Sequence, residues 1–193
     1  MLTSSLQATE GTYYKSETYK AQVAGAKKAG LVWGAYHFAM PPDSSGAKQA
    51  EFFIKNGGDW KQNDKGEHMP GMLDFERPPD MSQCYGMSAK EIVEWTEDFS
   101  DTYFKKTGRR PIIYTGSAWW EDCTKDSKKF SKDHPLALSQ WGDKYRVVPG
   151  GWEKPTIWQK DNHYKHGGDS DEFYGSVKDL KKFAGGIMYH DLL

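Results

Sequence analysis

The sequence predicts an α/β protein built around a parallel sheet. Short apolar segments alternate with longer segments of helical period, the order β then α repeats, and no low-complexity linker or internal repeat interrupts it. This pattern leaves two architectures open, a doubly wound open sheet and a closed barrel. The 193 residues match the size of one compact domain, so we expect a single domain over residues 1–193.

The predicted strands are short apolar runs separated by glycine, proline or polar residues. They cover residues 4–8, 31–38, 71–76, 111–115, 136–141 and 156–159. In a parallel sheet the carboxyl ends of the strands meet along one rim, which is where functional groups gather.

The predicted helices cover residues 17–29, 45–56, 88–106 and 176–183. The third has the clearest signals, because Ser88 and Glu91 form a capping box and apolar residues recur at helical spacing up to Gly108. Its Trp95 and Tyr103 are therefore expected in the core.

Composition excludes several partner classes. The chain has 26 basic and 27 acidic residues, a formal charge of −1, so we expect neither nucleic acid nor an anionic membrane as a partner. No segment is long enough to span a bilayer, and residues 1–6 lack the basic and apolar regions of a signal peptide. We expect no cofactor and a monomer.

Aromatic residues make up 15% of the chain and include eight Trp. Most of these rings are expected to fill the core, but a soluble protein this rich in Trp also has rings to place at a binding surface, where a flat apolar face suits a sugar.

The strongest chemical signal is the pair Asp74 and Glu76 at the end of the predicted strand 71–76. Side chains alternate along a strand, so both carboxyls lie on one face, with Cα atoms roughly 6.6 Å apart. Their repulsion favours one protonated and one ionised group, which glycoside hydrolysis requires. The alternatives are a solvated strand end or an ion pair with Arg77.

The other strand ends add aromatic and polar groups to the same rim. We predict these as substrate-binding residues: Tyr36, His37, Phe38, Tyr114, Trp141, Trp158 and Gln159. A single histidine such as His37 is, however, more often structural than chemical.

Two further features have open interpretations. The acidic segment 167–172 is read as a turn, or as a loop that contributes an acid to a shared site, because it lacks the ligand spacing of a helix-loop-helix calcium site. Cys84 and Cys123 form either one disulfide or two buried thiols, and neither has the spacing of a metal site.

Several short motifs along the chain carry a family resemblance. The chain resembles glycoside hydrolase family 25, especially its Chalaropsis-type lysozymes, from about residue 6 to 185. The motifs that carry the resemblance are A-T-E-G-T at 8–12, A-G-L at 29–31, G-A-Y-H-F at 34–38, L-D-F-E at 73–76, C-Y-G at 84–86, I-Y-T at 113–115, W-W-x-x-C at 119–123, I-W-Q at 157–159 and D-S-D-E-F-Y-G at 169–175.

The resemblance implies a TIM-like (β/α) barrel and a secreted muramidase that acts on bacterial peptidoglycan. It assigns Glu76 as the proton donor, Asp74 as the carboxylate that stabilises the charged intermediate, and Asp169 as a further catalytic acid, with Asp171 beside it as a substrate-binding residue. It also implies a disulfide between Cys84 and Cys123.

One departure from the family pattern concerns the strand before A-T-E-G-T. In the family a Gly-x-Asp-x-Ser strand and a helix precede this motif, whereas here the motif begins at Ala8. We therefore expect an N-terminally truncated barrel that lacks its first strand. Two alternatives to an active muramidase follow, a peptidoglycan-binding pseudoenzyme and a chitinase-like barrel hydrolase.

Overall fold

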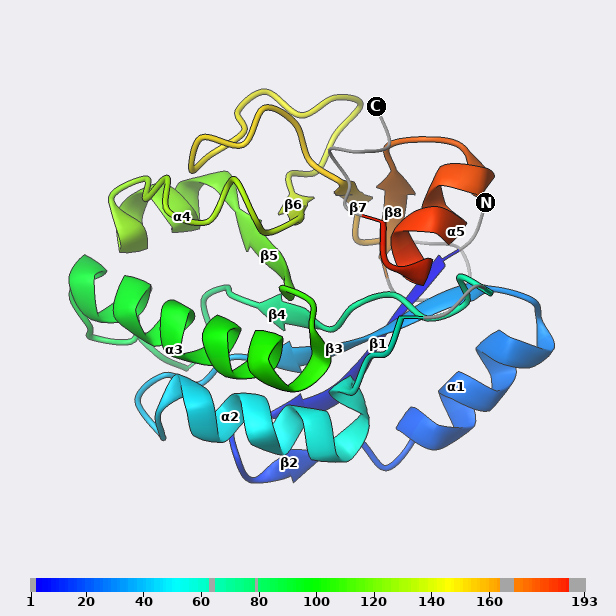
Figure 1. Ribbon diagram of the computed structural model, residues 1–193. Helices are drawn as coiled ribbons and strands as arrows, with labels where there is room; N and C mark the ends of the chain where they lie inside the picture. The colour runs from blue at the N-terminus through cyan, green and yellow to red at the C-terminus, as the bar shows by residue number, and fades with distance from the viewer. Residues whose placement is uncertain (1–2, 63–64, 79, 164–168, 188–193) are drawn as a thin grey trace.

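A computed structural model of the protein describes residues 3–62, 65–78, 80–163 and 169–187 (Figure 1). Its centre is one curled, open sheet in the order β2-β1-β3-β4-β5-β6-β7-β8. The strands are β1 (Thr3–Glu10), β2 (Tyr14–Lys15), β3 (Val32–Phe38), β4 (Met72–Asp74), β5 (Ile112–Gly116), β6 (Leu136–Ser139), β7 (Ile157–Asp161) and β8 (Ser170–Phe173). Six strands run parallel to one another, namely β1, β3, β4, β5, β6 and β7. At the two edges of the sheet, β2 pairs antiparallel with β1 and β8 pairs antiparallel with β7.

The helices follow the strands as expected for repeated βα units. They are α1 (Tyr19–Lys28), α2 (Gly46–Phe53) with a wider turn over Ile54–Gly58, α3 (Ala89–Thr107), α4 (Ser117–Thr124) and α5 (Val177–Gly185). Helices α1 to α4 lie around the outer face of the curled sheet, and α5 lies beside β7 and β8 (Figure 1). In the part of the chain that the structure describes, no helix is long and apolar enough to cross a bilayer.

Alternation along the strands gives the sheet two apolar faces. On the outer face Leu73, Ile113 and Leu138 join the large core beneath α2, α3 and α4. On the inner face residues such as Met72 and Ile112 pack against Leu180, Phe183 and Ala184 of α5, which closes the amino-terminal end of the curl. At the other end of the curl, where the carboxyl ends of the strands lie, α5 does not cover the inner face. We call this open end of the inner face, at the carboxyl ends of β1 and β3–β7, the cup.

The predicted barrel-type α/β fold is confirmed, and its sheet is curled but stays open. Strand β1 pairs with β3 at seven positions but with β2 only at Thr9 and Glu10, so most of its other edge has no partner strand among the described residues.

Three elements were not predicted. The short β2 and α4 have weak periodicity, and α4 begins at Ser117 directly after β5, with Gly116 as its N-cap. The acidic segment read as a turn forms β8, because Ser170–Phe173 pairs with β7 in a register that places Asp171 opposite Gln159. Gly167 and Gly168 of that segment lie outside the described residues.

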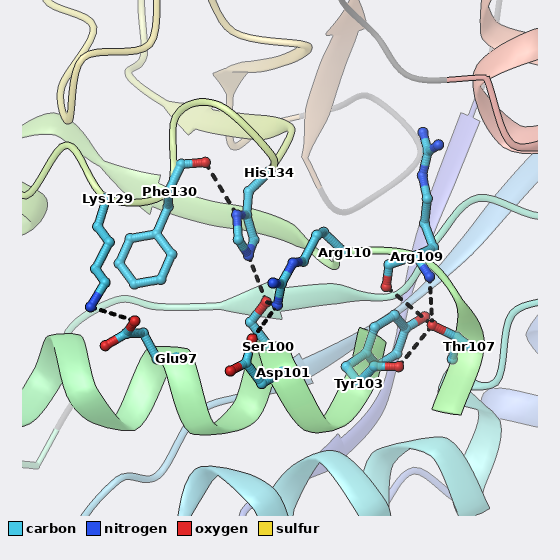
Figure 2. A network of polar contacts seen from close by, with 10 residues as sticks. All are labelled: Glu97, Ser100, Asp101, Tyr103, Thr107, Arg109, Arg110, Lys129, Phe130 and His134. Atoms are coloured by element: carbon cyan, nitrogen blue, oxygen red, sulfur yellow. Dashed lines mark hydrogen bonds and ion pairs between the residues drawn. The ribbon is translucent and has the colours of Figure 1, made fainter. Parts of the chain in front are cut away.

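The capping box of α3 is confirmed, and Trp95 and Tyr103 are buried as expected. Figure 2 shows how polar groups attach this helix to the loop before β6. The Nδ1 of His134 donates to the Phe130 carbonyl (3.1 Å), so its Nε2 accepts from the Ser100 hydroxyl (2.6 Å). Arg110 donates to Ser100 (3.2 Å) and to Asp101 (2.5 Å).

Burial first, and Arg110 second, lower the pKa of His134 to about 4 from an ordinary 6.5. The unfolded chain therefore takes up a proton before the folded one does. We expect stability to fall as pH drops from 6.5 to 4, by about 3 kcal/mol for this residue. In His134→Gln the loss of unfolding free energy between pH 7 and pH 4.5, measured in urea, should be smaller. An equal loss in wild type and variant would contradict this, and exposed His163→Gln is the control.

Cys84 and Cys123 form a disulfide between the loop before α3 and helix α4, with an S–S distance of 2.03 Å. The disulfide that the family resemblance implied is therefore confirmed. Because the bridge spans 39 positions, the double variant Cys84→Ser, Cys123→Ser should lose roughly 3–4 kcal/mol of unfolding free energy. Urea denaturation of both proteins measures this, and an unchanged midpoint would show that the cross-link does not restrain the unfolded chain.

Candidate active site

The open end of the cup holds a cavity of about 430 Å³ beside the ends of β1, β3 and β4. Its charged lining residues are all acids. The lining comprises Gln7, Glu10, Tyr36, Phe38, Met40, Asp74, Glu76, Pro78, Asp80 and Met81.

Asp74 and Glu76 share this cavity, as the alternation of the strand predicts, whereas Leu73 and Phe75 are fully buried in the outer core. Backbone bonds hold the segment beyond β4 in place, with Phe75 N donating to Tyr114 O (2.9 Å). The Tyr85 hydroxyl donates to Glu76 O (2.7 Å). Hydrogen bonds therefore anchor the backbone that carries the two carboxyls.

Asp74 is the more deeply buried acid, with 7% of its surface exposed. Among the residues that the structure describes, none forms a hydrogen bond with its Oδ1. Burial, followed by the charges of Glu76 and Asp169, raises the pKa of Asp74 well above its ordinary value. A buried carboxyl oxygen without a hydrogen bond lowers the stability of the fold. Residues with such unfavourable environments and shifted pKa values are concentrated in functional sites.

Three further acids, Glu76, Asp169 and Asp171, also have raised pKa values. Burial and the charge of Asp169 raise the pKa of Glu76, and burial and Asp161 raise the pKa of Asp169. Burial and Asp169 raise the pKa of Asp171 to about 6. Like charges concentrated in a concave site oppose one another's ionisation, so these acids hold their protons to higher pH than isolated carboxyls do.

The far side of the cup brings together several predicted rim residues. The Gln159 side chain on β7 accepts hydrogen bonds from Tyr114 (3.0 Å) and Trp141 (3.1 Å) and donates one to Asp169 (3.0 Å). Trp141 follows β6 and is 59% exposed. Trp158 is buried on the opposite side of β7, donates to Gln140 O (2.8 Å) and packs against Tyr145.

Trp141 also separates two surface grooves. One, of about 700 Å³, is lined by the start of α4 and by the loop after β6, including Glu121 and Arg146. The other, of about 900 Å³, lies over β7 and β8 and includes Trp158 and Glu172. An exposed indole between two grooves is suited to stack on an extended chain of sugar rings.

His37 does not lie at the rim, which corrects its predicted contact with substrate. The strand alternation turns it into the outer core, where it is fully buried between Phe53 and Phe99. It donates through Nε2 to Gln49 Oε1 (2.9 Å) and accepts from the Thr9 hydroxyl (2.8 Å). Burial lowers the pKa of His37 to about 4, so it stays neutral as a structural residue.

The cavity also contains residues that the sequence reasoning missed, notably Gln7 and Glu10. The first strand was predicted to end at Ala8, but a β-bulge between Gln7 and Thr9 lets β1 continue to Glu10. Applying the strand-end rule to the motif A-T-E-G-T would have placed Glu10 at the rim.

Among the residues that the structure describes, no three His, Cys, Asp or Glu side chains are grouped so that they could hold a metal ion. The chemistry of the cup is that of carboxylic acids, an amide and aromatic rings. Such a set can donate a proton and stabilise a cation on a carbohydrate.

Known proteins are similar to this chain in both sequence and fold. The chain is 44% identical over 94% of its length to an N,O-diacetylmuramidase of Arthroderma benhamiae, of which the alignment covers 76%, and 40% identical over 94% of its length to an N,O-diacetylmuramidase of Chalaropsis sp, of which it covers 87%. The structure of a muramidase from Acremonium alcalophilum superposes with a TM-score of 0.93 at 42% identity, covering 96% of this chain and 88% of that one. The model of glycosyl hydrolases family 25 matches residues 3–169, and the chain therefore belongs to that family.

Proposed function

We propose that the protein is a muramidase that hydrolyses the β-1,4 bond between N-acetylmuramic acid and N-acetylglucosamine in bacterial peptidoglycan. The observation that carries this proposal is the pair Asp74 and Glu76 in one acid-lined cavity at the open end of the cup. The relatives named as muramidases support the choice of substrate.

Glu76 is the proton donor in this proposal. Burial and the charge of Asp169 raise its pKa, which favours the protonated form that can donate, and the residue lines the cavity. It transfers this proton to the glycosidic oxygen as the bond to the anomeric carbon breaks. The carboxylate that remains then takes a proton from the incoming water.

Asp74 stabilises the positive charge that develops on the sugar. Its unpartnered Oδ1 is suited to accept the N–H of the 2-acetamido group, so that the acetamido oxygen approaches the anomeric carbon. Asp169 adds negative charge on the far side of the cup, since it influences the pKa of both Asp74 and Glu76.

The rings of Tyr36, Phe38, Tyr114, Trp141 and Trp158, with the Asp171 carboxyl, supply the proposed contacts to the glycan. The substrate lies outside cells, and the disulfide suits an oxidising compartment, so we propose that the protein acts extracellularly. We propose that it acts as a monomer.

Incubation of the protein with purified insoluble peptidoglycan tests the activity. We expect release of reducing ends, and mass spectrometry of the reduced products should find them on N-acetylmuramic acid. Reducing ends on N-acetylglucosamine, or faster cleavage of chitin, would favour a chitinase-like hydrolase. Sedimentation with peptidoglycan without any release would favour a binding protein that lacks turnover.

A further inference from the structure

The side chain of Gln159 connects four parts of the cup. Its Oε1 accepts hydrogen bonds from Tyr114 on β5 (3.0 Å), Ser139 on β6 (3.0 Å) and Trp141 in the loop after β6 (3.1 Å). Its Nε2 donates to Asp169 Oδ2 (3.0 Å). Only 8% of the residue is exposed, so this amide lies below the rim and not on its surface.

The chemistry of its partners fixes the orientation of this amide. The indole N–H of Trp141 can only donate, and an ionised Asp169 can only accept. Rotating the amide by 180° would set two donors against each other and two acceptors against each other. Gln159 is therefore held in one orientation and acts through its neighbours.

Trp141 is the one exposed residue among the eight Trp, since the other seven are buried. Its indole nitrogen is bonded to Gln159, whereas more than half of its surface faces solvent between the two grooves. A ring fixed at one atom and open on its face is preorganised for stacking, because little rotamer freedom is lost when a sugar binds.

We propose that Gln159 is a positioning residue that fixes the Asp169 carboxylate beside Asp74 and Glu76 and, through the same amide, fixes the Trp141 ring that receives the glycan. This inference rests on the proposed function of the cup. In this proposal one buried residue orients both an acid of the site and a sugar-binding ring.

Electrostatics give the proposal a specific signature. The acids that interact with Asp169 are Asp74 and Glu76 from the end of β4, Asp161 from β7 and Asp171 from β8, and Tyr36 from β3 also faces it. In these surroundings the Nε2–H of Gln159 is a donor that favours the ionised form of Asp169. Loss of this donor should raise the pKa of Asp169.

Two substitutions separate the two roles. Gln159→Glu keeps an oxygen for the Tyr114, Ser139 and Trp141 donors and, when ionised, replaces the donor to Asp169 by a second negative charge. Gln159→Met has a similar length and removes both functions. The matched control is Gln83→Glu, because Gln83 makes the same kind of bond to Asp122 (2.6 Å) at an exposed place away from the cup.

Acrylamide quenching of Trp fluorescence reports the position of Trp141 without any substrate. In the wild type the accessible emission should come from this ring, which Trp141→Phe would verify. We expect a higher quenching constant in Gln159→Met and an unchanged constant in Gln159→Glu and Gln83→Glu. In parallel, ¹³C NMR titration of the Asp carboxyls should show the Asp169 signal titrating at higher pH in both Gln159 variants.

The two substitutions should also differ in their effects on the kinetics. Gln159→Met is expected to raise KM roughly two- to tenfold, the effect of one lost hydrogen bond that orders a binding group. Gln159→Glu should keep near wild-type activity at acidic pH, where the new carboxyl is protonated and can donate to Asp169. Its activity relative to wild type should then fall about tenfold or more as pH rises and the two carboxylates repel each other.

Unchanged quenching and an unchanged Asp169 titration in folded Gln159→Met would overturn the proposal. If that variant does not fold, a pH-independent activity ratio and an unchanged Asp169 titration in Gln159→Glu would overturn it instead. If the spectroscopic changes occur but the wild type has no turnover, the proposed muramidase function fails while the positioning role of Gln159 stands.

Discussion

Glu76→Gln is expected to abolish turnover of peptidoglycan, with a loss of kcat of roughly 10²–10⁴-fold. The amide has nearly the same shape as the carboxyl but cannot deliver a proton to the glycosidic oxygen. Glu76 lies on the wall of the cavity, and its backbone carbonyl, which Tyr85 anchors, is untouched. The variant should therefore fold and bind the glycan like the wild type.

Release of reducing ends, followed over hours at high enzyme concentration, measures this loss, and thermal unfolding verifies the fold. The control is Glu94→Gln, because Glu94 is an exposed carboxylate on α3 paired only loosely with Lys90 (3.7 Å). Retention of more than a tenth of the wild-type kcat by Glu76→Gln would assign the proton donor to another acid.

Asp74→Asn is expected to lower kcat by roughly 10²–10³-fold, the usual effect of removing one electrostatic stabiliser of a transition state. The same change should make the protein more stable at neutral pH. A raised pKa in the folded state means that the unfolded chain ionises Asp74 first as pH rises. The folded state therefore loses stability between the unfolded pKa and the folded pKa, and the uncharged Asn avoids this loss.

Urea denaturation at pH 7 and at pH 3 tests the second part. We expect the midpoint of Asp74→Asn to exceed that of the wild type at pH 7, and the difference to disappear at pH 3, where Asp74 is protonated in both states. A variant less stable than the wild type at pH 7 would show that Asp74 has structural partners. Asp143→Asn, which changes an exposed carboxylate in the loop after β6, is the control.

Local signals in the sequence were sufficient for much of the framework. The capping box at Ser88 and Glu91 and the glycine at 108 delimit α3 within one residue, because caps act on neighbouring backbone groups. The alternation of Leu73, Asp74, Phe75 and Glu76 correctly placed both acids on one face of the sheet. These features depend on contacts between residues close in the chain.

Tertiary structure alone decided which rim residues reach the cup. His37 and Phe38 are adjacent in the sequence, yet the packing of α2 and α3 on the outer face buries the first and leaves the second at the cavity. The segment Ser170–Phe173 has no apolar alternation that would indicate a strand, and it becomes one because β7 offers an edge for pairing.

By itself, then, the sequence determined the α/β class, the order of most elements and the acidic pair, since periodicity, caps and strand alternation are local properties. The bulge that brings Glu10 to the cavity, the burial of His37 and the convergence of Tyr114, Ser139, Trp141 and Asp169 on Gln159 were decided only in three dimensions. They depend on which strands become neighbours and on which face each helix covers, and residues far apart in the chain settle both.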